Sequence, residues 1–196
     1  KVSEKLMPLV HLPVQSGSNK VLKLMNRKHT IEEYVGIINK LKNVKPNIKF
    51  SSDFIIGYPG ETYNDYEQTV KLMKDVKFIN SFSFIYSARP GTPASNLSEI
   101  NKIESKKRLM NFQTIAEKIK TNYKKSLIDK IVPVLFENEM KTKNEYFGRD
   151  EYFNSIVVKN SENLKGKIKN VKILKSNQNT LFGEVAESFN KTNHAA

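Results

Sequence analysis

The hydrophobic pattern of the first hundred residues alternates between the repeat of a strand and the repeat of a helix. Short apolar runs at 9–14, 49–56 and 82–86 are typical of buried strands. Residues 31–45 and 64–77 instead place apolar side chains three or four positions apart, which predicts amphipathic helices. A strand, a loop and a helix that recur in this order predict a parallel sheet with right-handed crossovers, so we expect an α/β fold.

A polar loop that contains glycine follows each of the three predicted strands, at 15–18, 57–62 and 87–94. The last of these loops is too rich in glycine and proline to form a helix. Loops at the carboxyl ends of parallel strands emerge on one side of the sheet, where α/β proteins bind their ligands. The opposite strand ends carry no comparable loop, and this asymmetry predicts a ligand site at the carboxyl edge of the sheet.

The pattern of the last third of the chain is different. A long helical pattern at 103–130 gives way to a period of two. This alternation predicts five strands, at 131–136, 143–147, 155–158, 166–175 and 180–186. Short strands at such close spacing are typical of a small β-barrel. We place the domain boundary near Ser126 and expect a frayed tail at 190–196.

Composition narrows the class of protein. Hydrophobic residues make up 38% of the 196 residues, but no apolar run approaches the roughly 20 residues that span a bilayer. We therefore expect a cytoplasmic protein with no membrane partner. The chain contains no cysteine, which excludes a disulfide scaffold and an iron–sulfur cluster held by its own thiolates. With three histidines in the chain, we predict no metal ligands.

The formal net charge of +13 indicates a polyanionic partner, most often a nucleic acid. The alternative is a general preference for lysine, which explains less well why acidic residues fail to balance the charge. The basic excess peaks at 102–125, which is either a solvated helix face or a helix that contacts phosphates. We name four lysines of this segment as candidate RNA contacts: Lys106, Lys107, Lys118 and Lys120.

Candidate ligand contacts follow from the period of two in the strands. His11 and Gln15 share the less apolar face of the first strand, and Asp53, Ile55 and Gly57 share one face of the second. A buried Asp53 requires either hydrogen bonds to the barrel wall or a ligand, and the sequence favours neither. For Gly57 alone, a tight turn is the simpler interpretation.

Arg89 lies in the third glycine-containing loop, where it is either a clamp for a carboxylate or phosphate or a surface ion pair. Phosphate-binding, serine-hydrolase and zinc-protease motifs are all missing from the sequence. The residues by themselves therefore predict half of an α/β barrel with a ligand face, but no reaction.

Three sequence strings resemble the tRNA methylthiotransferases of the radical S-adenosylmethionine superfamily. They are HLPVQSGSNKVLKLMNRKHT at 11–30, SSDFIIGYPGET at 51–62 and FSFIYSARPGTPA at 82–94, in the order and at the spacing of that family. The first and third are most similar to the MiaB type, which adds a methylthio group to C2 of N6-isopentenyladenosine beside the tRNA anticodon. The type that modifies threonylcarbamoyl-adenosine is the nearest alternative.

The resemblance implies a fold for both parts of the chain. Residues 1–125 would be the last three β/α units of a partial (β/α) barrel. Residues 126–189 would form a TRAM domain, an OB-like barrel that holds tRNA. The strings FGRD at 147–150, LKGKIKNVKI at 164–173 and LFGEVAE at 181–187 match that domain. Arg149 in the first of them is a further candidate RNA contact.

The resemblance also implies cofactors and partners. The family uses S-adenosylmethionine and two 4Fe-4S clusters, whose cysteine ligands would lie upstream of this chain, so we expect the segment alone to be inactive. Its implied partners are the anticodon stem-loop of tRNA, S-adenosylmethionine and a reducing electron donor. The implied cofactor contacts are Gln15, Ser16, Ser18, Asp53, Ile55 and Gly57.

The superfamily's GxIxGxxE pattern is imperfect in this chain. Asp53 replaces its first glycine, and Glu61 falls one residue late. Tyr86 and Arg89 are implied to lie on the substrate side of the site. Two other classes of protein stay open: a non-catalytic RNA-binding module, and a metabolic α/β-barrel enzyme that acts on a small anion.

Overall fold

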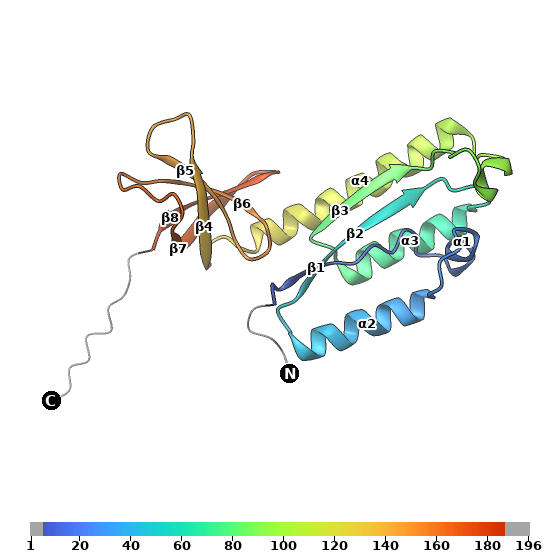
Figure 1. Ribbon diagram of the computed structural model, residues 1–196, viewed down its shortest axis with the longest axis horizontal. Helices are drawn as coiled ribbons and strands as arrows, with labels where there is room; N and C mark the ends of the chain where they lie inside the picture. The colour runs from blue at the N-terminus through green and yellow to red at the C-terminus, as the bar shows by residue number, and fades with distance from the viewer. Residues whose placement is uncertain (1–5, 187–196) are drawn as a thin grey trace. The chain divides into compact units, whose positions relative to one another are not determined.

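A computed structural model describes residues 6–186 of the chain (Figure 1). The chain separates into two compact units between Asn122 and Tyr123, and each unit is described by itself. The tail predicted at 190–196 lies outside the described residues. Among the helices described, none combines the length and hydropathy required to span a bilayer.

The first unit is a three-stranded parallel sheet with helices between its strands. Its elements are β1 (Leu9–His11), α1 (Asn19–Leu24), α2 (Ile31–Val44), β2 (Lys49–Ile56), α3 (Tyr63–Val76), β3 (Asn80–Ile85), a 3-10 helix η1 (Pro93–Asn96) and all but the last three residues of α4 (Lys102–Lys125). The sheet order is β1-β2-β3, and β2 and β3 run side by side in the same direction (Figure 1). The predicted alternation of strand and helix is confirmed.

Side chains at the helix starts explain where α2 and α3 begin. Thr30 accepts a hydrogen bond from the backbone N–H of Glu33, whose carboxylate in turn accepts the N–H of Thr30. This reciprocal arrangement is a capping box. Thr62 and Asp65 form the same arrangement at the start of α3. Both helices therefore begin where a polar side chain satisfies backbone donors that would otherwise lack partners.

One prediction for the loop after β3 is wrong. We expected no helix in the loop at 87–94, yet Pro93–Asn96 forms a short 3-10 helix. Proline is tolerated at the first position of a helix because its missing N–H has no helical partner there. The N–H of Ser95 donates to the carbonyl of Thr92 at 3.0 Å, which closes the turn.

The two faces of the sheet have opposite character, as the period of two predicts. Val14, Phe50 and Phe54 lie on the face that the helices cover, and all three are buried. The ring of Phe54 packs 4.8 Å from that of Phe112 on α4, centre to centre. On the other face, Phe82 is 50% exposed. The helices therefore cover one side of the sheet and leave the other open among the described residues.

The second unit is a closed five-stranded barrel with the strand order β4-β5-β6-β8-β7. Its strands are β4 (Ile131–Glu139), β5 (Glu145–Arg149), β6 (Ser155–Lys159), β7 (Ile168–Ser176) and β8 (Thr180–Val185). The interior is apolar and includes Val134, Phe136, Ile156, Val171, Ile173 and Leu181. The five predicted strands are confirmed, although β4 continues three residues beyond its predicted end. The last two, β7 and β8, pair in antiparallel orientation.

Two glycines allow the strands of this barrel to approach closely. A Cβ atom on Gly148 would lie 2.5 Å from the carbonyl oxygen of Leu135 on β4. A Cβ atom on Gly183 would meet the carbonyl oxygen of Lys172 on β7 in the same way. Because those obstacles are backbone atoms, neither contact can be relieved by a change of rotamer.

We expect Gly183→Ala to lower the free energy of unfolding of the barrel by about 1–3 kcal/mol or more, because the added methyl group overpacks the wall. Gly36→Ala is the matched control, since nothing lies within 4 Å of its Cβ in the middle of α2. That change should stabilise the first unit by about 0.5–1 kcal/mol. Calorimetry measures both, and an unchanged barrel transition in Gly183→Ala would contradict the close approach.

Candidate functional site

The three predicted loops meet at the carboxyl edge of the sheet. Val21, Tyr58 and Ala94, which lie in or after the three loops, form a buried apolar cluster. Ile55 and Tyr86 pack against this cluster, and the rings of Tyr58 and Tyr86 are 4.9 Å apart. The parallel strands therefore bring three segments that are distant in sequence to one edge, which agrees with the predicted architecture.

The first loop is held on α3 by its own hydroxyl groups. The hydroxyl of Ser16 lies 3.2 Å from that of Thr69, which also accepts the N–H of Gly17 at 2.9 Å. The hydroxyl of Ser18 donates to Asp65 at 2.7 Å. Both serines are buried. Their hydroxyls thus position the loop, and Ser18 also caps α1.

Asp65 is the electrostatic centre of this attachment. Burial alone would raise the pKa of its carboxyl group, but hydrogen bonds from Thr62, Ser18 and Lys20 more than compensate and hold that pKa well below its usual range. The carboxylate therefore stays ionised at neutral pH and orients Ser18 and Thr62, the N-cap residues of α1 and α3. The loop at 15–18 is consequently a rigid part of the edge.

Gln15 continues the pairing with β2 after the regular part of β1 has ended at His11. Its N–H donates to the carbonyl of Asp53, and its own carbonyl accepts the N–H of Ile55, both at 2.9 Å. Its φ of 74° lies in the left-handed region, which glutamine rarely adopts. This backbone conformation is energetically unfavourable for a residue other than glycine, so it persists only where the surrounding structure imposes it.

Asp53 differs from its prediction, because it is not buried. Its side chain is 31% exposed and lies on the open face of the sheet. The carboxylate is 3.4 Å from Nε2 of His11, whose Nδ1 is 2.9 Å from the hydroxyl of Ser51. The ring of Phe82 meets that of His11 edge-on at 6.4 Å. Polar and aromatic side chains therefore share this face without any covering layer among residues 6–186.

A buried ion pair fixes the second loop. The Glu61 side chain is 1% exposed, and its carboxylate lies 2.9 Å from the guanidinium of Arg108 on α4. The same carboxylate accepts the N–H of Gly57 at 3.2 Å. Burial raises the pKa of Glu61, while the hydrogen bonds from Arg108 and Gly57 oppose that rise. A Cβ on Gly57 would lie 2.6 Å from the hydroxyl of Ser105, so α4 also packs directly on this turn.

No motif in the sequence predicted this ion pair, although one signal was present. The first unit is rich in lysine, and Arg108 is the one arginine in the basic segment at 102–125. Its planar group contacts Glu61 and Glu104 together, at 2.9 Å each, which a lysine cannot reproduce. A single arginine among lysines therefore indicated a position where the planar guanidinium, which can donate to two carboxylates at once, is required.

The basic segment is not one continuous surface. Lys106, Lys107 and Lys118 are exposed on α4, whereas Lys120 is partly buried, 3.9 Å from Glu117. Arg108 is buried in the first unit, and its charge is neutralised there. Only part of the predicted positive charge is thus available to a partner.

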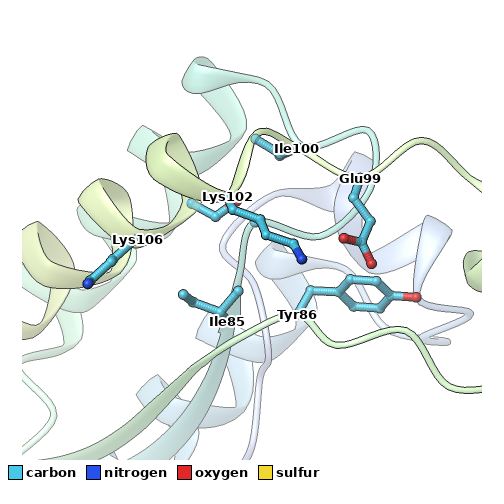
Figure 2. A pocket seen from close by; sticks show the side chains of 8 residues that line it. Ile85, Tyr86, Glu99, Ile100, Lys102 and Lys106 are labelled. Atoms are coloured by element: carbon cyan, nitrogen blue, oxygen red, sulfur yellow. The ribbon is translucent and has the colours of Figure 1, made fainter.

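A pocket of about 270 Å³ opens beside the end of β3. Ile85 and Ile100 contribute apolar walls, and Figure 2 shows Tyr86, Glu99 and Lys102 turned toward the same space. The pocket is slightly smaller than the 300 Å³ or so typical of small-molecule sites. Within the described residues, the hydroxyl of Tyr86 is buried and has no hydrogen-bond partner. This edge of the sheet therefore offers an unused polar group in an apolar setting.

The remaining predicted contacts are dispersed. Arg89 is exposed in the third loop, outside the cluster that holds Tyr86. Arg149 belongs to the second unit, where it lies 3.2 Å from Glu137. The structure therefore brings Gln15, Asp53, Ile55, Gly57 and Tyr86 to the strands and their carboxyl ends, and it does not bring the arginines there.

We expect Arg108→Lys to lower the free energy of unfolding of the first unit by about 2–4 kcal/mol, because an ammonium cannot contact both the buried Glu61 and the partly exposed Glu104 with the geometry of a guanidinium. Arg89→Lys is the matched control, and as an exposed substitution it should change that free energy by less than about 0.5 kcal/mol. Chemical denaturation followed by circular dichroism measures both. Equal free energies of unfolding in the two variants would show that the planar geometry of the Arg108 guanidinium does not contribute to stability.

Comparison with known proteins identifies two protein families that match parts of this chain. Residues 3–73 match the Radical SAM superfamily, and residues 125–186 match the TRAM domain. The tRNA-2-methylthio-N(6)-dimethylallyladenosine synthase of Pelagibacter ubique (strain HTCC1062) is 55% identical over 195 residues, which are 97% of this chain and 43% of that protein.

Proteins of the same name from other bacteria are similar too. The protein of Wolbachia pipientis subsp. Culex pipiens (strain wPip) is 48% identical over 182 residues, covering 91% of this chain and 41% of the relative. That of Orientia tsutsugamushi (strain Boryong) is 48% identical over 186 residues, covering 93% and 41%. The chain thus spans about two fifths of the length of these curated relatives. Its parallel sheet with a closed barrel and its two domain matches agree: the chain belongs to the radical SAM superfamily, as a homologue of the C-terminal part of the tRNA methylthiotransferases.

Proposed function

We propose that this chain is the C-terminal part of an enzyme that adds a methylthio group to C2 of N6-dimethylallyladenosine in tRNA. The observation that carries the proposal is the 55% identity over 195 residues to a relative whose name states that product. This identity extends through both units of the chain. The relatives described above all carry the dimethylallyladenosine name, so the threonylcarbamoyl-adenosine reaction is not favoured.

The carboxyl edge of the sheet is the proposed site for S-adenosylmethionine. Ile55 and Tyr86 offer apolar surface for an adenine ring, and Gln15 and Asp53 offer polar groups for a ribose. The unpartnered hydroxyl of Tyr86 supports a polar ligand at this edge. The left-handed turn at Gly57 has no side chain, which lets Ser105 of α4 pack closely beside this edge. These residues therefore fit a nucleoside.

Ser16 and Ser18 take a supporting role in this proposal. Their hydroxyls are bonded to Thr69 and Asp65, so they hold the backbone at Gln15 in place. S-adenosylmethionine and the 4Fe-4S clusters would together supply the radical chemistry. The chain has no cysteine, so thiolate ligands of the clusters would belong to other parts of the enzyme.

The proposed partner is the anticodon stem-loop of a tRNA in the cytoplasm. Lys106, Lys107 and Lys118 are exposed on α4, and Lys120 is partly accessible beside them. The match of the second unit to a TRAM domain supports contact with RNA, which an enzyme acting on a small anion would not require. Arg89 and Arg149 are additional proposed contacts with phosphate groups.

The reaction can be tested in the longer protein that contains this chain. We expect the anaerobically reconstituted enzyme, given S-adenosylmethionine and a reductant, to produce the methylthiolated nucleoside in tRNA that carries N6-dimethylallyladenosine. Mass spectrometry of digested tRNA measures the product. Asp53→Asn should lower turnover at least about tenfold, since a lost charge contact of about 1.5–3 kcal/mol corresponds to that factor, with little change in thermal stability because the side chain is partly exposed.

Asp75→Asn is the control for that variant, because Asp75 pairs with Lys71 on the exposed side of α3 and should leave turnover unchanged. Product formed only on tRNA that carries threonylcarbamoyl-adenosine would refute the proposed substrate. Wild-type turnover in Asp53→Asn would make that residue structural.

We also expect charge reversal of Lys106, Lys107 and Lys118 to glutamate to weaken tRNA binding by the same longer protein and to flatten its salt dependence. Each lost phosphate contact should reduce the slope of log K against log salt by about 0.7–0.9. Lys74→Glu on α3 is the matched control for a single exposed lysine. Unchanged affinity and slope in the triple variant would remove α4 from the RNA interface.

A further inference from the structure

Two phenylalanines of the barrel point away from its interior. Gly148 and Gly183 occupy inward positions, where a side chain would strike a neighbouring strand. Successive residues of a strand face opposite sides, so Phe147 and Phe182, which directly precede these glycines, lie on the outer surface. Both rings are partly exposed. The glycines thus serve barrel closure, whereas the phenylalanines contribute no side chain to the core.

Strand register places these two rings in one row. Phe147 on β5 pairs with Val157 on β6, and Val157 pairs with Phe182 on β8. Phe182 in turn pairs with Lys175 on β7. Neighbouring strands are about 4.8 Å apart, so the two phenylalanines are separated by about 10 Å, with the short Val157 side chain between them. The row is therefore an apolar strip across the outer surface of the barrel.

A cation lies over each ring of this strip. The guanidinium carbon of Arg149 is 5.5 Å from the ring centre of Phe147, and Nζ of Lys175 is 5.2 Å from that of Phe182. Exposed contacts of this kind are worth only about 0.5–1 kcal/mol, so both flexible side chains can turn to other partners. Arg149 also contacts Glu137, which leaves Lys175 as the less constrained of the two.

We propose that Phe147, Val157 and Phe182, flanked by Arg149 and Lys175, bind unpaired RNA by stacking bases on the two rings and pairing the cations with phosphates. Aromatic rings on a sheet surface bind bases in this way, and cations beside them neutralise the backbone. The proposal rests on the proposed function and deepens it. It assigns single-stranded loop nucleotides, and not duplex RNA, to the second unit.

Another exposed patch on the same barrel lacks this chemistry. Leu135 and Ile168 form a cross-strand pair on the outer side of β4 and β7, and Ile168 is 68% exposed. Both side chains are aliphatic, so they offer no ring on which a base can stack. The patch nevertheless supplies a control substitution of an outward-facing apolar side chain in the same unit.

The test uses the purified chain and a fluorescently labelled single-stranded RNA oligonucleotide, with anisotropy measured at several salt concentrations. Phe147→Leu and Phe182→Leu should each weaken binding by about 5- to 150-fold without changing the salt slope, because a base–ring stack is lost but no charge is. Arg149→Gln and Lys175→Gln should instead reduce that slope by about 0.7 each. Ile168→Ala should bind like the wild type.

Two further measurements keep the outcome clear. Phe147→Trp and Phe182→Trp retain a ring and should bind at least as tightly as the wild type, and thermal melting of every variant shows whether the barrel is folded. Folded leucine variants with wild-type affinity, or equal affinity of the wild type for duplex RNA, would overturn the proposal. Failure of the methylthiolation assay with intact single-strand binding would instead count against the proposed function alone.

Discussion

The ion pair between Glu61 and Arg108 determines how the carboxyl edge is built. It joins Glu61 in the turn after β2 to Arg108 in the N-terminal third of α4, and these two residues are 47 apart in sequence. Because Glu61 also accepts the N–H of Gly57, the same pair sets the point where β2 ends. Pairs of this kind are sensitive to geometry, since the desolvation of both charges is repaid only by good contacts. The backbone of the proposed nucleoside site is therefore held by charges that do not themselves face a ligand.

Much of the architecture could be predicted because it depends on local periodicity. The strands at 49–56 and 180–186 and the helix at 31–45 follow from short stretches of sequence, and the structure places them within a residue of the predicted ends. The meeting of the three loops follows from the parallel order of the strands. In each case, the conformation depends on short stretches of sequence and on the order in which the strands follow one another along the chain.

The site was harder to predict, because its contacts join residues far apart in the chain. The hydroxyls of Ser16 and Ser18 resembled ligand contacts, yet they bond to Thr69 and Asp65, about 50 residues away. Asp53 was expected to be buried, but no described element covers its face of the sheet. Periodicity assigns a residue to a face, and it does not say whether another layer lies over that face.

The left-handed backbone at Gln15 has a consequence for engineering. A non-glycine residue in this region costs about 1–2 kcal/mol, so the chain is less stable here than a glycine variant would be. A library selected for heat resistance alone would therefore replace the glutamine and would discard its amide group in the process. Where the amide serves a ligand, thermostability and activity are in conflict at this one position.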